Sequence, residues 1–284
     1  GFSGSGSSYT ATFIPADNST ASGLISVDSS RFTDAAGNAN ISGSLTLAVD
    51  TVVPGITITS SDSALKAGET ATITFTLSEA STDFTAEDIS VSGGSIDNFT
   101  AVSATVYTAV FTPEENSTAS GLISVDSSSF SDAAGNANPS NSLLLTIDTV
   151  VPTISITSSD DALKAGETAT ITFELSEPSE DFTAEDVNVT GGTITGFSGE
   201  GTSYTATFTP EENSTASGLI SVDSSSFSDA AGNDNTGGSL MLAVDTVVPG
   251  ITITTSDDAL KAGETATITF ELSEPSEDFT AEDV

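Results

Sequence analysis

Carboxylate and amide side chains recur along this chain in three short patterns, and these are the residue types that could do chemistry. The patterns are DAAGN, an acidic segment of the form SExSxDFTAED, and DTVVP. They begin at residues 34, 132 and 229, at residues 78, 176 and 273, and at residues 50, 148 and 245, respectively. Paired carboxylates could act as a general acid and base, as in glycoside hydrolysis. Alternatively, their oxygens could bind a hard cation such as Ca²⁺.

The residues that nucleophilic catalysis requires are missing from the sequence. There is no His and no Cys to serve as base or nucleophile. A Ser–Lys pair would have to use Lys66, Lys164 or Lys261, and each lies in an ALKAGE segment that we interpret as a surface turn. A repeated glycosidase site would lack an aromatic sugar platform, because the chain has no Trp. We therefore predict that the protein is not an enzyme.

The charge of the chain limits its partners. There are 41 acidic residues against 4 basic ones, a formal net charge of −37. Such a surface repels nucleic acid and anionic membranes, and no apolar run is long enough for a transmembrane helix. Without Cys or His, disulfides and ordinary zinc sites are excluded. The chain starts at Gly1 without a Met or a signal peptide, so we expect it to be a piece of a longer protein.

Internal repetition organises the sequence. DTVVP recurs after 98 and then 97 residues, and LKAGETATITF recurs with the same steps. A period of this size indicates tandem domains. We predict the C-terminal half of one repeat at 1–50, complete repeats at 51–148 and 149–245, and the N-terminal part of another at 246–284. The two partial repeats suggest either a window cut from a longer array or halves that head-to-tail copies of the chain complete.

Period-2 alternation of apolar residues predicts seven short strands in each repeat and no helix. In the repeat at 51–148 the strands are expected at 56–58, 71–77, 89–91, near 99, at 107–111, 123–125 and 143–147. Seven strands in about 97 residues are typical of an immunoglobulin-like sandwich. The predicted fold is therefore all-β, with tandem seven-stranded antiparallel Ig-like sandwiches joined end to end by short linkers.

In such a sandwich, three acidic segments meet at one pole: the incoming linker, the loop after the second strand and the loop before the last strand. Their mutual repulsion is relieved either by exposure to water or by a bound cation. Ca²⁺, which takes 6–8 oxygen ligands, fits better than Mg²⁺, which prefers strict octahedra. The sequence predicts calcium at these junctions, with Asp88 and Asp132 best placed. The candidate ligands are Asp34, Asn38, Asp50, Glu79, Asp83, Asp88, Asp132, Asn136, Asp148, Glu177, Asp181, Asp186, Asp229, Asn233, Asp245, Glu274, Asp278 and Asp283.

The combination of ITFTLSEASTDFTAEDISVSGG, YTAVFTPEEN, FSDAAGN and LLLTIDTVVP resembles the bacterial Ig-like repeats of giant secreted adhesins, including biofilm-associated and RTX-type adhesins. The resemblance spans the whole chain. It implies an extracellular, calcium-stiffened extender region that holds a binding module away from the cell, with neighbouring repeats of the same chain as its partners. It also implies Asp148, Glu177, Asp186, Asp229 and Asn233 as ligands. The alternative function is a self-assembling extracellular filament or surface-layer subunit, and a lectin-like module is disfavoured because the repeats are nearly identical.

Overall fold

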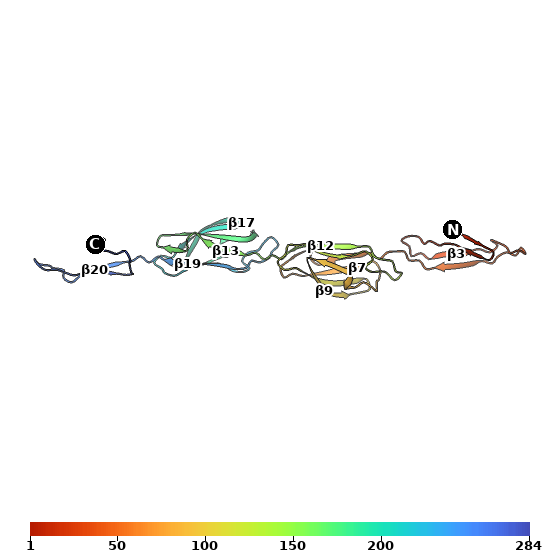
Figure 1. The fold of residues 1–284 in the computed structure, drawn as a ribbon, viewed down its shortest axis with the longest axis horizontal. Helices are drawn as coiled ribbons and strands as arrows, with labels where there is room; N and C mark the ends of the chain where they lie inside the picture. Colours follow the sequence, from red (N-terminus) through yellow and green to blue (C-terminus); the bar gives the residue numbers. More distant parts are fainter. The chain divides into compact units, whose positions relative to one another are not determined.

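The computed structural model describes residues 1–284 and divides them into two compact units, Gly1–Val150 and Val151–Val284, which are described separately. Both units are built from β-strands (Figure 1). The helical elements are two 3₁₀ turns, η1 (Ala86–Asp88) and η2 (Ala184–Asp186). No helix is long and apolar enough to cross a membrane.

In the first unit, two four-stranded sheets face each other, with strand orders β5-β7-β10-β9 and β6-β12-β11-β8. We call this the β5–β12 sandwich. Its strands are β5 (Ile56–Ser60), β6 (Ala64–Lys66), β7 (Ala71–Leu77), β8 (Ile89–Ser92), β9 (Gly94–Ala101), β10 (Val106–Pro113), β11 (Gly121–Val125) and β12 (Asn141–Asp148). The predicted all-β sandwich is confirmed.

The core lies between these two sheets and follows the period-2 pattern. On β7 the residues Ala71, Ile73, Phe75 and Leu77 are buried, while the threonines between them are exposed or half-buried. Burial of the Ile, Phe and Leu side chains supplies roughly 1.5–3 kcal/mol each. Phe84, in the loop after β7, packs its ring edge-on against four aromatic rings of the core, those of Phe75, Phe99, Tyr107 and Phe130. The acidic loop after β7 is thereby anchored in the core.

One expectation about the strands was wrong. The segment Ala64–Lys66, interpreted from the sequence as part of a turn, forms β6 and pairs in parallel with β12. The chain crosses from one sheet to the other after β5, and Leu65 enters the core with 2% of its surface exposed. The turn itself is confined to the following residues, where Gly68 has a φ of +78°. Each sandwich is therefore antiparallel apart from this one parallel pair.

The second unit repeats the arrangement in the β13–β19 sandwich. Its sheets have the orders β13-β15-β17 and β14-β19-β18-β16. Their bounds are β13 (Ile154–Ser158), β14 (Ala162–Lys164), β15 (Ala169–Ser179), β16 (Val187–Thr190), β17 (Gly192–Pro210), β18 (Gly218–Val222) and β19 (Gly238–Asp245). The single long strand β17 corresponds in sequence to both β9 and β10 of the first unit.

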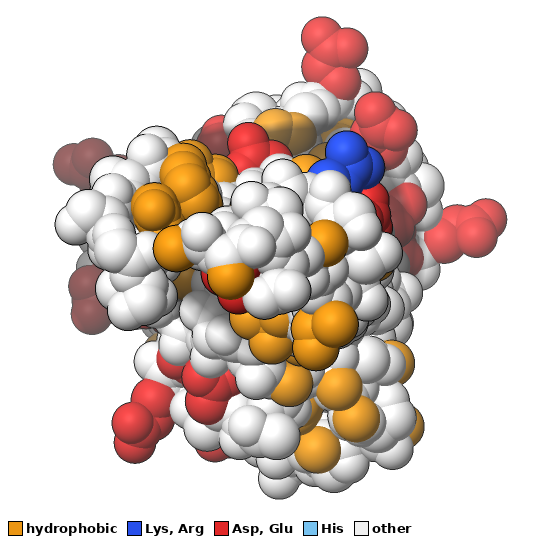
Figure 2. All heavy atoms as spheres, turned by 90° about the vertical axis from the view of Figure 1, so that its right-hand side faces the viewer, with side chains coloured by type: hydrophobic (Ala, Val, Ile, Leu, Met, Phe, Trp, Pro, Cys, Tyr) orange, Lys and Arg blue, Asp and Glu red, His pale blue; other side chains and the backbone are white.

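The remaining strands form smaller sheets. They are β1 (Ser3–Ser5), β2 (Ser8–Thr10), β3 (Gly23–Val27) and β4 (Gly43–Leu47) in the first unit, and β20 (Ile251–Thr255) and β21 (Ile268–Leu272) in the second. Their apolar faces lack a covering sheet. Ile25 and Val27 are 41% and 46% exposed, whereas Ile123 and Val125 at the equivalent positions are 0% exposed. Figure 2 shows apolar side chains exposed on one face, where acidic side chains far outnumber basic ones.

Candidate metal centre

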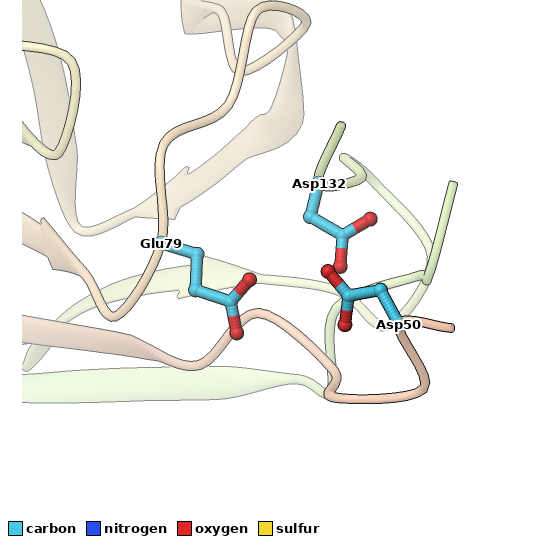
Figure 3. Close-up of side chains that lie close together, drawn as sticks. All are labelled: Asp50, Glu79 and Asp132. Atoms are coloured by element: carbon cyan, nitrogen blue, oxygen red, sulfur yellow. The ribbon is translucent and has the colours of Figure 1, made fainter. Parts of the chain in front are cut away.

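Three carboxylates from separate segments meet beside the β5–β12 sandwich. Asp50 lies in the linker before β5, Glu79 in the loop after β7, and Asp132 in the loop between β11 and β12. One oxygen from each lies within 4.8 Å of the others (Figure 3). Oxygens that bind one Ca²⁺ at 2.3–2.6 Å lie no farther than about 5 Å apart. The three residues therefore could hold a single metal ion.

Asp132 is held by the turn that it begins. Its Oδ1 accepts hydrogen bonds from the backbone N–H groups of Ala134 and Asn136, each at 2.9 Å, and its Oδ2 accepts one from Asn136 Nδ2 at 2.8 Å. Gly135 supplies the left-handed φ of +88° that this turn requires. The same bonds form around Asp34 in the DAAGN copy at 34–38. The hydrogen bonds that form the DAAGN turn are thus local.

These hydrogen bonds also set the charge state of Asp132. The Asn136 side chain lowers the pKa of the Asp132 carboxyl most, and this effect together with the backbone donors outweighs the burial that raises it. Asp132 is buried, with 8% of its surface exposed, yet it stays ionised at neutral pH. A cation ligand must be in this ionised form.

The linker that carries Asp50 is fixed on both sides. The backbone carbonyl of Asp50 accepts a hydrogen bond from Asn136 Nδ2 at 3.2 Å, and its carboxylate accepts one from Val52 N at 3.1 Å. The next residue, Thr51, donates its hydroxyl to Ala16 O at 2.7 Å and accepts a bond from Ser19 N at 2.9 Å. The Thr51 hydroxyl thus ties the linker to the loop before β3, while Asp50 faces Glu79 and Asp132.

Glu79 supplies the third carboxylate. It is half-buried, and no protein group donates a hydrogen bond to its carboxylate. Its two oxygens are therefore available to a ligand, in contrast to those of Asp132. Figure 3 shows the side chain directed towards Asp50 and Asp132.

The other predicted ligands of this sandwich make hydrogen bonds within the protein. The Asp88 Oδ2 atom accepts hydrogen bonds from the backbone N–H and the hydroxyl of Thr85, at 2.7 and 3.1 Å, and so caps η1. The Asp83 carboxylate binds two serines, and Asn136 donates its amide to Asp132 and Asp50. The structure brings neither Asp83 nor Asp88 into the group of three, although Asp88 was expected among the best placed.

The second unit repeats these local arrangements. Asp229 is 9% exposed and accepts hydrogen bonds from Ala231 N and Asn233 N, at 2.8 and 2.9 Å. Asp181 binds two serines, and Asp186 caps η2 through the Thr183 N–H at 2.7 Å. Glu177 lies near the end of β15 and is half-buried.

The predicted ligands that flank these sandwiches make short local bonds. Asp148, at the end of β12, accepts one from Val150 N at 3.2 Å, and Asp245 accepts one from Val247 N at 3.2 Å. Asp278 binds the Ser276 hydroxyl at 2.6 Å, and Asp283 caps a turn through Thr280 N at 2.8 Å. Glu274 lines an open cleft together with Asp278 and Asp283. Asp34 and Asn38 form the exposed DAAGN turn described above.

A model of the bacterial Ig-like domain family matches residues 1–49, 50–147, 148–244 and 245–284. The chain belongs to this family. No curated protein matches it.

Solved structures of adhesins are among those that resemble this bacterial Ig-like chain. The Escherichia coli adhesin FdeC matches at 15% identity and a TM-score of 0.40, over 82% of this chain and 87% of that one. Invasin, a bacterial integrin-binding protein, matches at 14% identity and a TM-score of 0.40, over 89% of this chain and 60% of that one. The Yersinia pseudotuberculosis adhesin InvE has a TM-score of 0.30 at 12% identity, over 67% of this chain and 59% of that one.

Sequence reasoning missed several polar residues that hold the loops of these Ig-like sandwiches. Asn138 is 2% exposed, accepts a hydrogen bond from Phe130 N at 2.9 Å and donates to Asp126 O and Pro139 O at 2.7 and 2.9 Å. Asn235 makes the equivalent bonds in the second unit. The signal was present in the sequence, because an Asn stands two residues after each DAAGN turn, at 40, 138 and 235.

Proposed function

We propose that this chain is a structural spacer of a cell-surface or secreted adhesin, and that Ca²⁺ bound by Asp50, Glu79 and Asp132 stiffens the entry to its β5–β12 repeat. In this role the chain carries out no catalysis. Its successive Ig-like repeats are residues 1–50, 51–148, 149–245 and 246–284, of which the middle two are complete and the outer two are partial.

The observation that carries the calcium part is the convergence of three carboxylates from three separate segments. Three negative charges within 4.8 Å repel one another, and each pair costs about 0.9 kcal/mol even in a water-like dielectric. The chain has only 4 basic residues with which to neutralise them. A divalent cation with oxygen ligands relieves this repulsion, and water and backbone carbonyls would complete its 6–8 ligands.

The spacer part is supported by the repetition and by the way the linkers are held. Thr149, which follows β12, donates its hydroxyl to Glu114 O at 2.6 Å and accepts a bond from Ser117 N at 2.9 Å, as Thr51 does at the preceding linker. Thr246 makes the same pair of bonds in the second unit. Each of these linkers is thus hydrogen-bonded to the sandwich that precedes it. Such linkers suit a spacer of fixed length better than a string of independently moving domains. For Asp148, Glu177 and Asp229, calcium binding is proposed from the repeated sequence alone.

The test is a calcium titration of chelator-stripped protein, followed by melting temperature and by small-angle X-ray scattering. Binding to the folded state raises stability by mass action, and a stiffened array increases the maximum dimension of the molecule in solution. Magnesium at the same concentration serves as the control. If millimolar calcium changes neither quantity, the calcium part of the proposal is refuted.

A further inference from the structure

The Asp83 carboxylate joins the two loops that carry Glu79 and Asp132. Its Oδ1 accepts hydrogen bonds from the Ser81 hydroxyl at 2.6 Å and from Ser131 N at 3.0 Å, and its Oδ2 accepts one from the Ser131 hydroxyl at 2.7 Å. Ser81 lies two residues after Glu79, and Ser131 directly precedes Asp132. A single carboxylate therefore connects both ligand-bearing segments.

The same connection is made in the second unit. Asp181 accepts hydrogen bonds from the Ser179 hydroxyl at 2.6 Å, from Ser228 N at 2.9 Å and from the Ser228 hydroxyl at 2.8 Å. Asp278, at the third copy of the acidic segment, binds the Ser276 hydroxyl at 2.6 Å within its own loop. The bond to the nearer serine is thus a local property of the loop, whereas the bonds to the farther serine are tertiary.

The loop that carries Asp83 is itself fixed to the core. The Tyr107 hydroxyl donates to Ser81 O at 3.2 Å, Ser81 is 6% exposed, and the Phe84 ring packs among the core aromatics. The turn that begins at Asp132 has its own hydrogen bonds but needs an attachment to set its distance from Glu79. Asp83 supplies two hydrogen bonds of that attachment, and both are charge-assisted.

We propose that Asp83, and Asp181 in the second unit, are positioning residues for the cation site and not ligands: each clamps the loop after the second core strand to the DAAGN turn and so sets the distance between Glu79 and Asp132 or their equivalents. This inference rests on the proposed calcium function. It reassigns two residues that the sequence had nominated as ligands.

The test compares matched variants of the full chain, with each substitution made in both complete sandwiches so that both sites shift together. Asp83→Ala with Asp181→Ala removes the clamp. Ser131→Ala with Ser228→Ala removes only the hydroxyl that reaches the carboxylate. Ser131→Thr with Ser228→Thr keeps that hydroxyl and serves as the conservative control; Thr33 already occupies this position in the DAAGN copy at 34–38. Isothermal titration calorimetry with CaCl₂ gives the affinity, and melting in chelator gives the calcium-free stability.

If Asp83 positions the two loops, the Asp→Ala variant should bind calcium about tenfold more weakly, near the lower end of the range for partners of metal ligands, because the Asp83 carboxylate is solvent-exposed. The Ser→Ala variant should also bind more weakly but lose less, because the Ser131 backbone N–H still donates to Asp83 Oδ1. The positioning role also predicts that the Ser→Thr variant binds as the unmodified chain does, and that the two losses are not additive when combined. Asp→Asn variants, which keep one acceptor oxygen, provide the same test if the Asp→Ala chain does not fold.

Three results would overturn the inference. If the Asp→Ala variant loses affinity while the Ser→Ala variant does not, then Asp83 is a ligand. If melting temperature falls equally in calcium and in chelator with no change in affinity, the carboxylate is only structural. If the unmodified chain binds no calcium, the proposed function fails and this inference fails with it, whereas in the first two cases the proposed function stands.

Discussion

Replacing Glu79 by Gln should change the stability of the protein in opposite directions with and without calcium. The substitution keeps the shape of the side chain, and in the structure it costs no hydrogen bond. It removes one of three charges whose oxygens lie within 4.8 Å, and with it two of the three repulsions. At that separation each repulsion is worth about 0.9 kcal/mol or more.

In chelator the E79Q chain should therefore be more stable than the unmodified chain by roughly 1–2 kcal/mol, which raises the melting temperature of a domain of this size by on the order of 5 °C. Salt at 0.1 M weakens the repulsion between the carboxylates but does not abolish it, because the Debye length of about 10 Å exceeds the distances between their oxygens. In saturating calcium the order should reverse. The unmodified site gains about 2.7 kcal/mol at a calcium concentration 100 times its Kd, while the variant has lost a carboxylate ligand and gains less.

The assay is differential scanning calorimetry of the full chain, once in chelator and once in millimolar calcium. Glu115→Gln is the matched control, since it changes the net charge equally at an exposed position outside the cluster. The reasoning is refuted if E79Q is no more stable than the unmodified chain in chelator, since the carboxylates would then be too well solvated to repel. It is also refuted if calcium raises both melting temperatures equally, because Glu79 would not be a ligand.

Four further predictions concern the parts that hold the site. Asn138→Ala should destabilise its sandwich by roughly 2–4 kcal/mol in urea titrations, because three hydrogen bonds of a residue that is 2% exposed are lost; a loss below about 1 kcal/mol would contradict this. Phe111→Ala, at a position 0% exposed, should cost about 3–5 kcal/mol by calorimetry. Thr149→Val should cost about 1–2 kcal/mol and speed amide exchange in the loop after β10, because two hydrogen bonds to that loop are lost. Finally, the free energy of unfolding of the calcium-free chain should decrease as the pH drops below about 4. Replacing Asp83 and Asp181 by Asn should make this decrease less steep.

Hydrogen bonds lower the pKa of both the Asp83 and the Asp181 carboxyl. The pKa of Asp83 is lowered most by the Ser81 hydroxyl and then by the N–H and hydroxyl of Ser131. Burial of Asp181 opposes the shift, but the bonds from its two serines together lower its pKa as well. A group whose pKa is lower in the folded state stabilises the fold above its unfolded pKa, and this stabilisation disappears as the pH falls through the folded value. Melting between pH 5 and pH 2 measures it, and an unchanged slope in the Asn variants would contradict the assignment.

The local features of the chain could be predicted from sequence. Alternation at Ala71, Ile73, Phe75 and Leu77 predicted a half-buried strand, since side-chain direction in a strand follows the sequence position alone. The DAAGN turn was equally predictable, because its acceptor and donors lie within four residues of one another. Strand β6 was missed because three residues are too few to show a period and because its partner β12 lies about 80 residues later.

The sequence by itself determined the all-β fold, the repeat and the acidic character of the loops, because each depends on local pattern and composition. Only the tertiary structure decided the separate roles of Glu79, Asp83 and Asp88, which are three acids within ten residues. Asp88 caps its own turn, Asp83 is bonded to a serine 48 residues away, and Glu79 faces Asp50 and Asp132. A carboxylate has the same chemistry at all three positions, and its role depends on the hydrogen-bond donors and charges that folding brings within reach.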